Sequence, residues 1–394
     1  MIRPTIATVS LAAIQQNLRA IQALVGRPSG AEAPSPALAG PPPRLARPTP
    51  PQVIAVVKAN AYGHGAPEVG LALERAGAAM LACADIEEGV ALRDAGVGIP
   101  ILVFGALSVS DLSGLFEHGL TPTVSTPAAA RALDDAAGAR GVRIGCHLKI
   151  DTGMNRLGFR HDNLTRTMPP LLASRHLRID AVYTHFATAD VPESPFLDEQ
   201  RARFDRATAA LGAMGLTGVR RHAANSAALL RDAGTWYDWV RPGLLLYGIV
   251  PPPLAAADLA LGPALSLSSR IVAVKGVRAG EGAGYGLRWR ADGPRTIAIV
   301  PAGYADGLDT RFGGRASVLV RGRRVPIVGA VSMDMITIDV TGLEIAPGDE
   351  VVIIGRQGEA AITAREVAGE IGSIPWEVLC HLGSRIQRTY GPAV

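Results

Sequence analysis

Short apolar runs alternate with helix-like segments through the first two-thirds of the chain, and this alternation restricts the possible folds most strongly. Eight such runs follow the first helical stretch: VIAVVKA, MLACA, PILVFG, LTPTVS, RIGCHLKID, IDAVYTHFA, RHAANS and WVRPGLLLYG. Strands that alternate with helices form parallel sheets, and eight repeats over roughly 250 residues are typical of a closed barrel. We therefore predict an α/β protein with a (β/α)8 barrel over residues 11–255.

The last third of the chain has a different pattern. From about Leu261, β-rich runs such as RTIAIVPAG and VPIVGAVSMDMITIDV are separated by Gly, Asp and Pro turns, which predicts a mostly β second domain. We assign residues 1–10 and 256–394 to this domain, although the short run Thr5 to Val9 suits a strand of either domain. Nine of the 29 prolines crowd into residues 27–51, so we expect a disordered, proline-rich insertion there.

Composition excludes several classes of protein. The formal net charge is +4, but the basic residues are scattered with few aromatics among them, unlike the basic stripe of a nucleic-acid-binding surface. Cys83, Cys146 and Cys380 lie far apart without metal-ligand spacing, so we expect reduced thiols and no metal site. No signal-peptide pattern and no membrane-spanning apolar stretch is visible. We expect a cytoplasmic protein that binds neither nucleic acid nor membrane.

Lysine is rare in this chain, because only Lys58, Lys149 and Lys275 are lysines among 39 basic residues. Arginine neither loses its proton at ordinary pH nor acts as an amine nucleophile, so a retained lysine is a candidate for chemistry. Lys58 is the strongest candidate, since it ends the apolar run VIAVV and precedes the turn-rich stretch ANAYGHG. This pattern predicts a buried strand that carries an amine to the end of the barrel where active sites form. Lys275 fits a solvated surface residue, and we assign it no role.

Several motifs, taken in order, resemble those of the alanine racemases. AVVKANAYGHG is the most specific of them, and it is followed by LKIDTGMNRLGF, THFATAD, HAANSAA, VRPGLLLYG, GYGLRW, GYADG and VSMD. The resemblance spans nearly the whole chain outside the proline-rich insertion. It implies an enzyme that uses pyridoxal 5'-phosphate, a barrel followed by a β domain, and a small amino acid as substrate.

The resemblance also implies the two catalytic bases. Lys58 would hold the cofactor as an internal Schiff base and, once substrate displaces it, serve as one base, which suits a buried amine with a lowered pKa. Tyr285, in the turn Gly-Tyr-Gly, would be the second base on the opposite face of the carbanion, reaching the site from the second subunit. This implies a homodimer with shared active sites that interconverts L-alanine and D-alanine and supplies D-alanine for peptidoglycan.

The residues that match the family's cofactor contacts lie in the barrel. Besides Lys58 they are Tyr62, Arg156, His185, Asn225, Ser226, Arg241, Gly243 and Leu244. Asn225-Ser226 and Gly243-Leu244 follow the seventh and eighth predicted strands, where barrels commonly bind phosphate. Without the resemblance, both pairs fit ordinary turns better than a phosphate site.

Two cationic residues match family positions that set the electron-withdrawing strength of the cofactor's pyridine ring and the charge near it. Arg241 matches the contact to the pyridine nitrogen, where an arginine donates a hydrogen bond without giving up its proton and leaves the ring a weaker electron sink. That favours reprotonation of the α-carbon over transamination. Lys149 matches a lysine that carries a carbamate in family members, seven residues before Arg156, so we expect possible carbamylation there.

The substrate-binding residues implied by the resemblance are Arg156, Met333, Asp334 and Tyr304, the last three in the β domain. Ser384 stands where some family members have a tyrosine that touches both the phosphate and the entrance. This departure leaves open a wider entrance and a broader substrate range.

Other functions stay open at this point. The same scaffold suits a racemase of larger amino acids or an amino-acid decarboxylase, although Arg241 argues against the decarboxylase because such enzymes present an acidic partner to the ring. A non-catalytic carrier of pyridoxal phosphate would need only Lys58 and the phosphate contacts, and Tyr285 argues against it. A lysine Schiff-base aldolase without cofactor is a further alternative.

Overall fold

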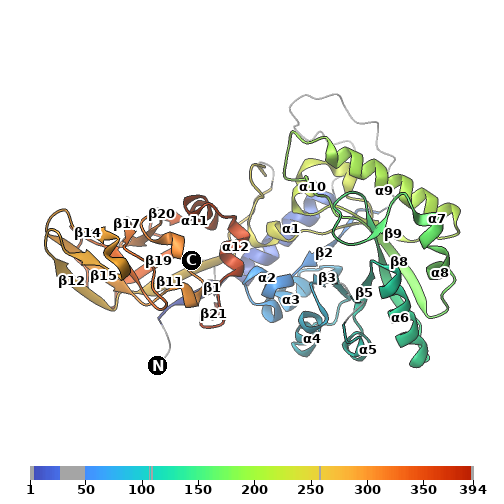
Figure 1. Ribbon diagram of the computed structural model, residues 1–394, viewed down its shortest axis with the longest axis horizontal. Helices are drawn as coiled ribbons and strands as arrows, with labels where there is room; N and C mark the ends of the chain where they lie inside the picture. The colour runs from blue at the N-terminus through green and yellow to red at the C-terminus, as the bar shows by residue number, and fades with distance from the viewer. Residues whose placement is uncertain (1–3, 27–48, 106, 108–109, 257–258, 392–394) are drawn as a thin grey trace. The chain divides into compact units, whose positions relative to one another are not determined.

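The computed structural model describes residues 4–26, 49–105, 107, 110–256 and 259–391 (Figure 1). The chain folds as two compact units. The barrel unit comprises Gln15–Ala59 and Ala66–Leu261, and the β unit comprises Met1–Ile14, Asn60–Gly65 and Gly262–Val394. Most of the predicted proline-rich insertion, residues 27–48, lies outside the described residues.

Eight parallel strands close into a barrel within the described part of the barrel unit. They are β2 (Gln52–Val56), β3 (Met80–Cys83), β4 (Ile101–Val103), β5 (Thr121–Val124), β6 (Ile144–Asp151), β8 (Leu177–Tyr183), β9 (Arg220–His222) and β10 (Trp239–Val240). Each pairs in parallel with the next, and β10 pairs with β2 to close the ring. The predicted barrel is therefore confirmed, with a strand in each of the eight apolar runs. These strands read as continuous apolar runs because both of their faces are buried.

Helices cover the outside of the barrel strands (Figure 1). They are α1 (Leu11–Val25), α3 (Ala66–Arg75), α4 (Ile86–Asp94), α5 (Ser113–Glu117), α6 (Pro127–Ala139), α7 (Leu164–Thr167), α8 (Pro169–Leu172), α9 (Phe196–Ala213) and α10 (Ser226–Arg231), and the short strand β7 (Phe159–Arg160) pairs with β6. Side-chain caps set several of their starts, as where Asp85 accepts from the Glu88 amide at 2.9 Å. No described helix is both long and apolar enough to cross a bilayer.

The β unit is built on one large sheet and a short hairpin, as the sequence predicted. Its strands are β1 (Ile6–Val9), β11 (Leu265–Arg270), β12 (Ala273–Val277), β13 (Gly282–Ala283), β14 (Trp289–Arg290), β15 (Arg295–Val300), β16 (Ser317–Val320), β17 (Arg323–Val328), β18 (Ile336–Asp339), β19 (Glu350–Gln357), β20 (Ala360–Ile362) and β21 (Gln387–Tyr390), with helices α11 (Ala364–Ile371) and α12 (Pro375–Cys380). The strand order of the large sheet is β12-β15-β18-β17-β16-β19-β11-β1-β21, and β20 pairs with β19. Because β1 pairs with β11 and β21, the first strand of the chain belongs to this unit.

A left-handed turn, α2 (Lys58–Tyr62), follows the first barrel strand. Residues 59–62 have φ between 52° and 55°, which costs roughly 1–2 kcal/mol for each non-glycine residue. His64 Nδ1 lies 3.0 Å from the carbonyl oxygens of both Ala61 and Tyr62. Burial lowers the pKa of His64 to about 4, so the ring is neutral and donates its Nδ1 proton to these carbonyls. Contacts outside the turn therefore stabilise a conformation that its own residues disfavour.

The C-terminal strand β21 also contacts the segment after this turn. Arg388 Nε donates to the carbonyl of Gly63 at 2.8 Å. Gly65 has φ +95°, and a Cβ on it would lie 2.0 Å from the Tyr390 hydroxyl oxygen. A side chain at position 65 is thus excluded by the backbone conformation and by the neighbouring tyrosine.

Gly65→Ala should destabilise the protein more than Gly96→Ala does. The two glycines have φ of +95° and +96°, but a Cβ on Gly96 would meet nothing within 4 Å. We expect Gly96→Ala to lower the free energy of unfolding by roughly 1–2 kcal/mol, and Gly65→Ala by about 1–3 kcal/mol more, because of the overlap with Tyr390. Denaturant titration of both variants measures this difference, and equal losses would contradict the packing of β21 against the turn.

Candidate active site

The predicted cofactor residues of the barrel unit gather where the parallel strands end. Lys58 follows β2, Arg156 is in the loop after β6, His185 follows β8, Asn225 and Ser226 follow β9, and Arg241, Gly243 and Leu244 follow β10. Lys149, the predicted carbamylation site, is the third residue from the end of β6. The C-terminal ends of all barrel strands share one face of the barrel. The structure therefore places these residues on the face where barrel enzymes carry their active sites.

Arg241 is almost completely buried, with 3% of its surface exposed. Its Nη1 lies 2.8 Å from His222 Nδ1, and its Nη2 donates to the carbonyls of Thr184 at 2.7 Å and Ala223 at 2.9 Å. His222 Nε2 in turn lies 3.1 Å from His147 Nδ1. A guanidinium only donates, so His222 Nδ1 must accept, and the Nε2 of the neutral ring must carry the proton that it gives to His147. Arginine thereby fixes the tautomers of both histidines.

Aromatic rings hold this histidine pair in place. Tyr183 stacks on His222 with 4.7 Å between ring centroids and 6° between ring planes, and Trp239 stacks on His147 at 5.6 Å and 17°. The Tyr183 hydroxyl bonds to Thr123 at 3.1 Å, and burial raises the pKa of Tyr183 to about 12, so it stays a neutral phenol. Sequence reasoning missed both histidines, although His147 and His222 lie in the quoted motifs HLKID and RHAAN.

Positive charge is concentrated around His185. Desolvation lowers its pKa well below the ordinary value, and the charges of Arg241, Lys149, Arg156 and Lys58 lower it further. The same effects lower the pKa of Lys149 to about 8, with burial as the largest cause and Arg156 next. His185 is therefore neutral, and a site with this many cations is suited to an anionic ligand.

The backbone beside Lys58 is fixed by neighbouring barrel strands. The Val57 amide donates to Ala82 O at 2.8 Å, and the Ala59 amide donates to Glu88 Oε1 at 2.6 Å. The second carboxylate oxygen of Glu88 accepts from the Ala84 amide at 2.7 Å, so this side chain joins the ends of β2 and β3. Lys58 itself is half-buried. Sequence reasoning also missed Glu88, whose only local signal is its place three residues after the helix cap Asp85.

The loops after β9 and β10 are joined through a serine hydroxyl. Ser226 Oγ accepts from the amides of Gly243 at 3.0 Å and Leu245 at 3.4 Å. Asn225 caps α10 by accepting from the Ala228 amide at 2.9 Å. The Ser226 hydroxyl therefore accepts from two backbone amides and keeps its own O–H as a donor at the beginning of α10, which suits a phosphate oxygen. Tyr62, at the end of the left-handed turn, is half-buried.

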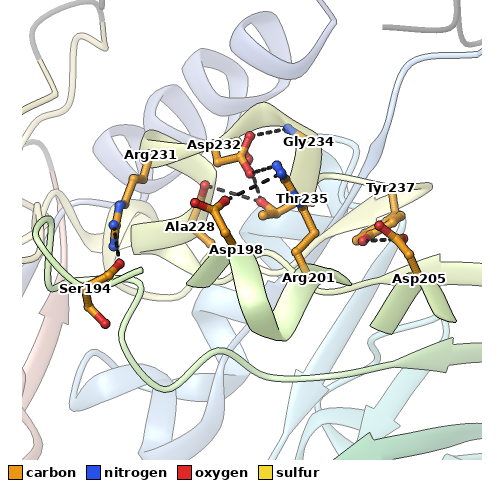
Figure 2. A network of polar contacts seen from close by, with 10 residues as sticks. All are labelled: Ser194, Asp198, Arg201, Asp205, Ala228, Arg231, Asp232, Gly234, Thr235 and Tyr237. Carbon is orange, nitrogen blue, oxygen red and sulfur yellow. Dashed lines mark hydrogen bonds and ion pairs between the residues drawn. The ribbon is translucent and has the colours of Figure 1, made fainter. Parts of the chain in front are cut away.

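Helices α9 and α10 are braced against each other on the outside of the barrel unit (Figure 2). Arg201 forms an ion pair with Asp232, which follows α10. Arg231, the last residue of α10, donates to five backbone carbonyls of residues 188–194, including Ser194 O at 3.0 Å. The loop that follows His185 is therefore held by the same short helix that begins with Ser226.

The remaining predicted residues lie in the β unit and are largely exposed. Tyr285 is 76% exposed in the turn η4 (Tyr285–Leu287) between β13 and β14. Tyr304 begins the turn η5 (Tyr304–Asp306), and its amide donates to Ser332 O at 3.0 Å. The Ala305 amide donates to Met333 O at 3.0 Å, so the structure brings Tyr304 and Met333 together.

Arg385 is a further residue of this group that sequence reasoning missed. Its Nη2 donates to Asp334 Oδ1 at 2.7 Å, and its Nε lies 3.6 Å from Asp306 Oδ1. The adjacent Ser384 is exposed. The guanidinium therefore links the loop of Asp334 to the turn that begins at Tyr304.

Comparisons with known proteins agree along the chain. The family model described as alanine racemase, N-terminal domain, matches residues 44–251, and the one described as alanine racemase, C-terminal domain, matches residues 264–390. An alanine racemase of Symbiobacterium thermophilum is 39% identical over 390 residues, which cover 99% of this chain and 97% of the relative. One from Sorangium cellulosum is 40% identical over 399 residues and covers 98% and 99%.

Solved structures give the same result. The crystal structure of alanine racemase from Streptomyces lavendulae aligns with a TM-score of 0.90 at 32% identity and covers 100% of this chain and 98% of that one. Alanine racemase from Bacillus anthracis, with bound L-Ala-P, aligns with a TM-score of 0.88 at 34% identity and covers 99% and 96%.

Proposed function

The chain belongs to the alanine racemase family and is a racemase that interconverts L-alanine and D-alanine, and we propose that it does so with pyridoxal 5'-phosphate bound at the C-terminal face of the barrel. The observation that carries the cofactor proposal is the group of four cationic side chains around the neutral His185. The proposal includes a cytoplasmic location and the supply of D-alanine for peptidoglycan, a role that follows from the family.

The residues present fit a phosphorylated pyridine aldehyde. Lys58 supplies an amine for the aldehyde carbon, and the Ser226 hydroxyl, which accepts from the amides of Gly243 and Leu245, keeps its own O–H to donate to the phosphate. Arg241 has more N–H groups than its acceptors among the described residues use, which leaves a donor for the ring nitrogen. Its described hydrogen-bond partners are all neutral, so an anionic ligand would offset the cost of its burial.

When bound, the cofactor supplies an electron-withdrawing ring that stabilises the negative charge left on the α-carbon of alanine. Lys58 then removes or returns the α-proton on one face, and the partner subunit's Tyr285 does so on the other. Arg241 would donate a hydrogen bond to the ring nitrogen and keep its own proton, which would leave the ring a weaker electron sink and favour return of a proton to the α-carbon. Arg156 neutralises the carboxylate of the substrate, and Met333 and Asp334 of the partner subunit position it.

Lys58→Ala should abolish D-alanine formation from L-alanine by the cofactor-reconstituted protein, because the variant lacks the amine assigned to the cofactor aldehyde, and the other described lysine at this face, Lys149, is assigned to the carbamate. Lys275→Ala is the matched control, since Lys275 is exposed in the β unit. We expect Lys275→Ala to keep wild-type turnover and the yellow cofactor band, and Lys58→Ala to lose both. Turnover by Lys58→Ala would contradict the assignment of Lys58 as the cofactor-binding amine and catalytic base. A yellow wild-type protein that does not turn over alanine would point to a larger amino acid as the substrate.

The exposed β-unit residues support a homodimer with shared sites. Tyr285 and Met333, which the catalytic scheme needs, are 76% and 51% exposed, and the neighbouring Leu287 is 47% exposed. Large apolar side chains on one set of loops are typical of a surface that a partner covers. We propose that these loops complete the site of the second subunit in a two-fold dimer.

Co-expression of Lys58→Ala with Tyr285→Phe tests this sharing. If each site takes Lys58 from one subunit and Tyr285 from the other, a mixed dimer has one site with both residues intact. Random assembly then restores about a quarter of the wild-type sites, although each variant alone is impaired. Racemase assays on the purified mixture measure this, with separately expressed and unmixed variants as controls. No gain over the average of the two variants would rule out sites shared between subunits.

We also propose that Lys149 becomes a carbamate that pairs with Arg156. The pKa of Lys149 is lowered to about 8, so a large fraction of its amine is neutral and nucleophilic near that pH. The nitrogen attacks carbon dioxide, a C–N bond forms, and one N–H proton leaves to solvent, which converts a buried cation into an anion. The product would balance the nearby positive charges of Arg156 and Arg241.

The initial rate of carbamate formation at Lys149 should rise with pH at a fixed concentration of dissolved carbon dioxide. Protonation blocks the amine, so a lowered pKa makes the reactive form appear around pH 8 and not near 10.5. Carbon-13 NMR with labelled carbon dioxide measures the adduct, and Lys149→Arg is the control without a reactive amine. A rate that stays flat through pH 8, or an equal signal in Lys149→Arg, would remove the proposal.

A further inference from the structure

Gln200 on α9 is completely buried, yet every polar group of its side chain is used. Its Nε2 donates to Thr152 Oγ1 at 3.1 Å and to His185 O at 3.1 Å, and its Oε1 accepts from the Ala187 amide at 2.8 Å. The amide orientation is fixed because the Ala187 amide only donates and the His185 carbonyl only accepts. A buried carboxamide is costly without such partners, so hydrogen bonding and not packing explains glutamine at this position.

The partners of Gln200 come from two different loops. Thr152 begins the loop after β6, four residues before Arg156, and His185 and Ala187 lie in the loop after β8. The two loops also meet directly, since Thr152 Oγ1 lies 2.8 Å from Thr184 Oγ1. We propose that Gln200 is a positioning residue of the racemase site, which holds the loops of Arg156 and His185 in register with each other. This inference rests on the proposed function for the roles of those two residues.

The same contacts extend to Arg241. Its Nη2 donates to Thr184 O at 2.7 Å and lies 3.4 Å from His185 Nδ1. We call the hydrogen bonds of Gln200 to Thr152, His185 and Ala187 the clamp. Through the two loops, the clamp connects Arg156, assigned to the substrate carboxylate, with Arg241, assigned to the ring nitrogen. A displacement of about 1 Å at such groups can lower a rate by roughly a hundredfold, so loosening these loops should act on catalysis.

Helix α9 has its own attachments, which do not depend on Gln200. Arg201 pairs with Asp232, and the Tyr237 hydroxyl donates to Asp205 at 2.8 Å (Figure 2). Phe204, also fully buried on α9, packs its ring edge-on to Tyr237 with 5.2 Å between centroids. Loss of the Gln200 carboxamide should thus loosen the two loops while the helix stays in place.

The test compares Gln200→Met with Phe204→Leu in the cofactor-loaded protein. Methionine fills nearly the same space without hydrogen bonds, whereas Phe204→Leu weakens packing on the same helix and removes none of the hydrogen bonds that Gln200 makes. Thr152→Val cuts the clamp from its other end and serves if Gln200→Met folds poorly. For each variant we would measure the thermal midpoint, kcat and KM for alanine, visible circular dichroism of the bound cofactor, and amide hydrogen exchange.

We expect Gln200→Met to lower kcat/KM by roughly 10- to 100-fold, to change the cofactor dichroism, and to speed exchange of the Ala187 amide by about tenfold. Phe204→Leu should lower the thermal midpoint without these changes. Thr152→Val should act in the same direction as Gln200→Met, and the double variant should lose less activity than the product of the two single losses, because both substitutions break the bond between Gln200 and Thr152.

The failures can be told apart. If the wild-type protein racemises alanine and Gln200→Met matches Phe204→Leu in kcat/KM, dichroism and exchange, the clamp is overturned and the proposed function stands. If the wild-type protein has no racemase activity, the proposed function is overturned. In that case, amide hydrogen exchange at residues 152–157 and 184–188 still tests whether Gln200 holds the two loops. Unchanged exchange in Gln200→Met would overturn that role as well.

Discussion

The guanidinium of Arg241, buried among neutral acceptors, is the constraint on which the catalytic face depends. A group that cannot accept a hydrogen bond or release its proton dictates the protonation of whatever surrounds it. His222 has to accept a hydrogen bond at Nδ1 and donate one from Nε2 to His147, and burial lowers the pKa of both histidines, so this pair stays neutral. Under the proposed function, Arg241 would therefore donate to the ring nitrogen of the cofactor without protonating it.

The cationic side chains around His185 repel one another, and an anionic ligand reduces this repulsion. Burial lowers the pKa of His185, and the charges of Arg241, Lys149, Arg156 and Lys58 lower it further, so these cations oppose the addition of another positive charge. The phosphate, the substrate carboxylate and the carbamate of the proposed function would each offset part of this repulsion. The same charge therefore favours ligand binding and keeps the imidazole neutral, and both effects follow from burial at the ends of the barrel strands.

The sequence predicted the barrel because each strand is apolar on both faces and is bounded by turns, which are local signals. It could not predict the left-handed turn at residues 59–62, where no glycine marks the positive φ and the stabilising contacts include His64 and a strand more than 300 residues away. The site residues in quoted motifs were accessible through resemblance. Glu88 and Gln200 were not, because their roles arise from backbone groups on other strands and loops, and a polar residue in a helix carries no sign of such partners.

The scarcity of lysine also has a structural explanation that composition alone does not give. Arg93, Arg231 and Arg388 each donate to four or five backbone carbonyls, which tie together loop segments, and none of these contacts is to a carboxylate. A planar fork with several fixed donors can span that many acceptors, whereas an ammonium is a compact group with fewer donors. Arginine therefore serves where a permanent cation holds the backbone. The chemistry assigned to Lys58 and Lys149 needs a nitrogen that loses its proton and forms a bond to carbon, and a guanidinium does not do this at ordinary pH.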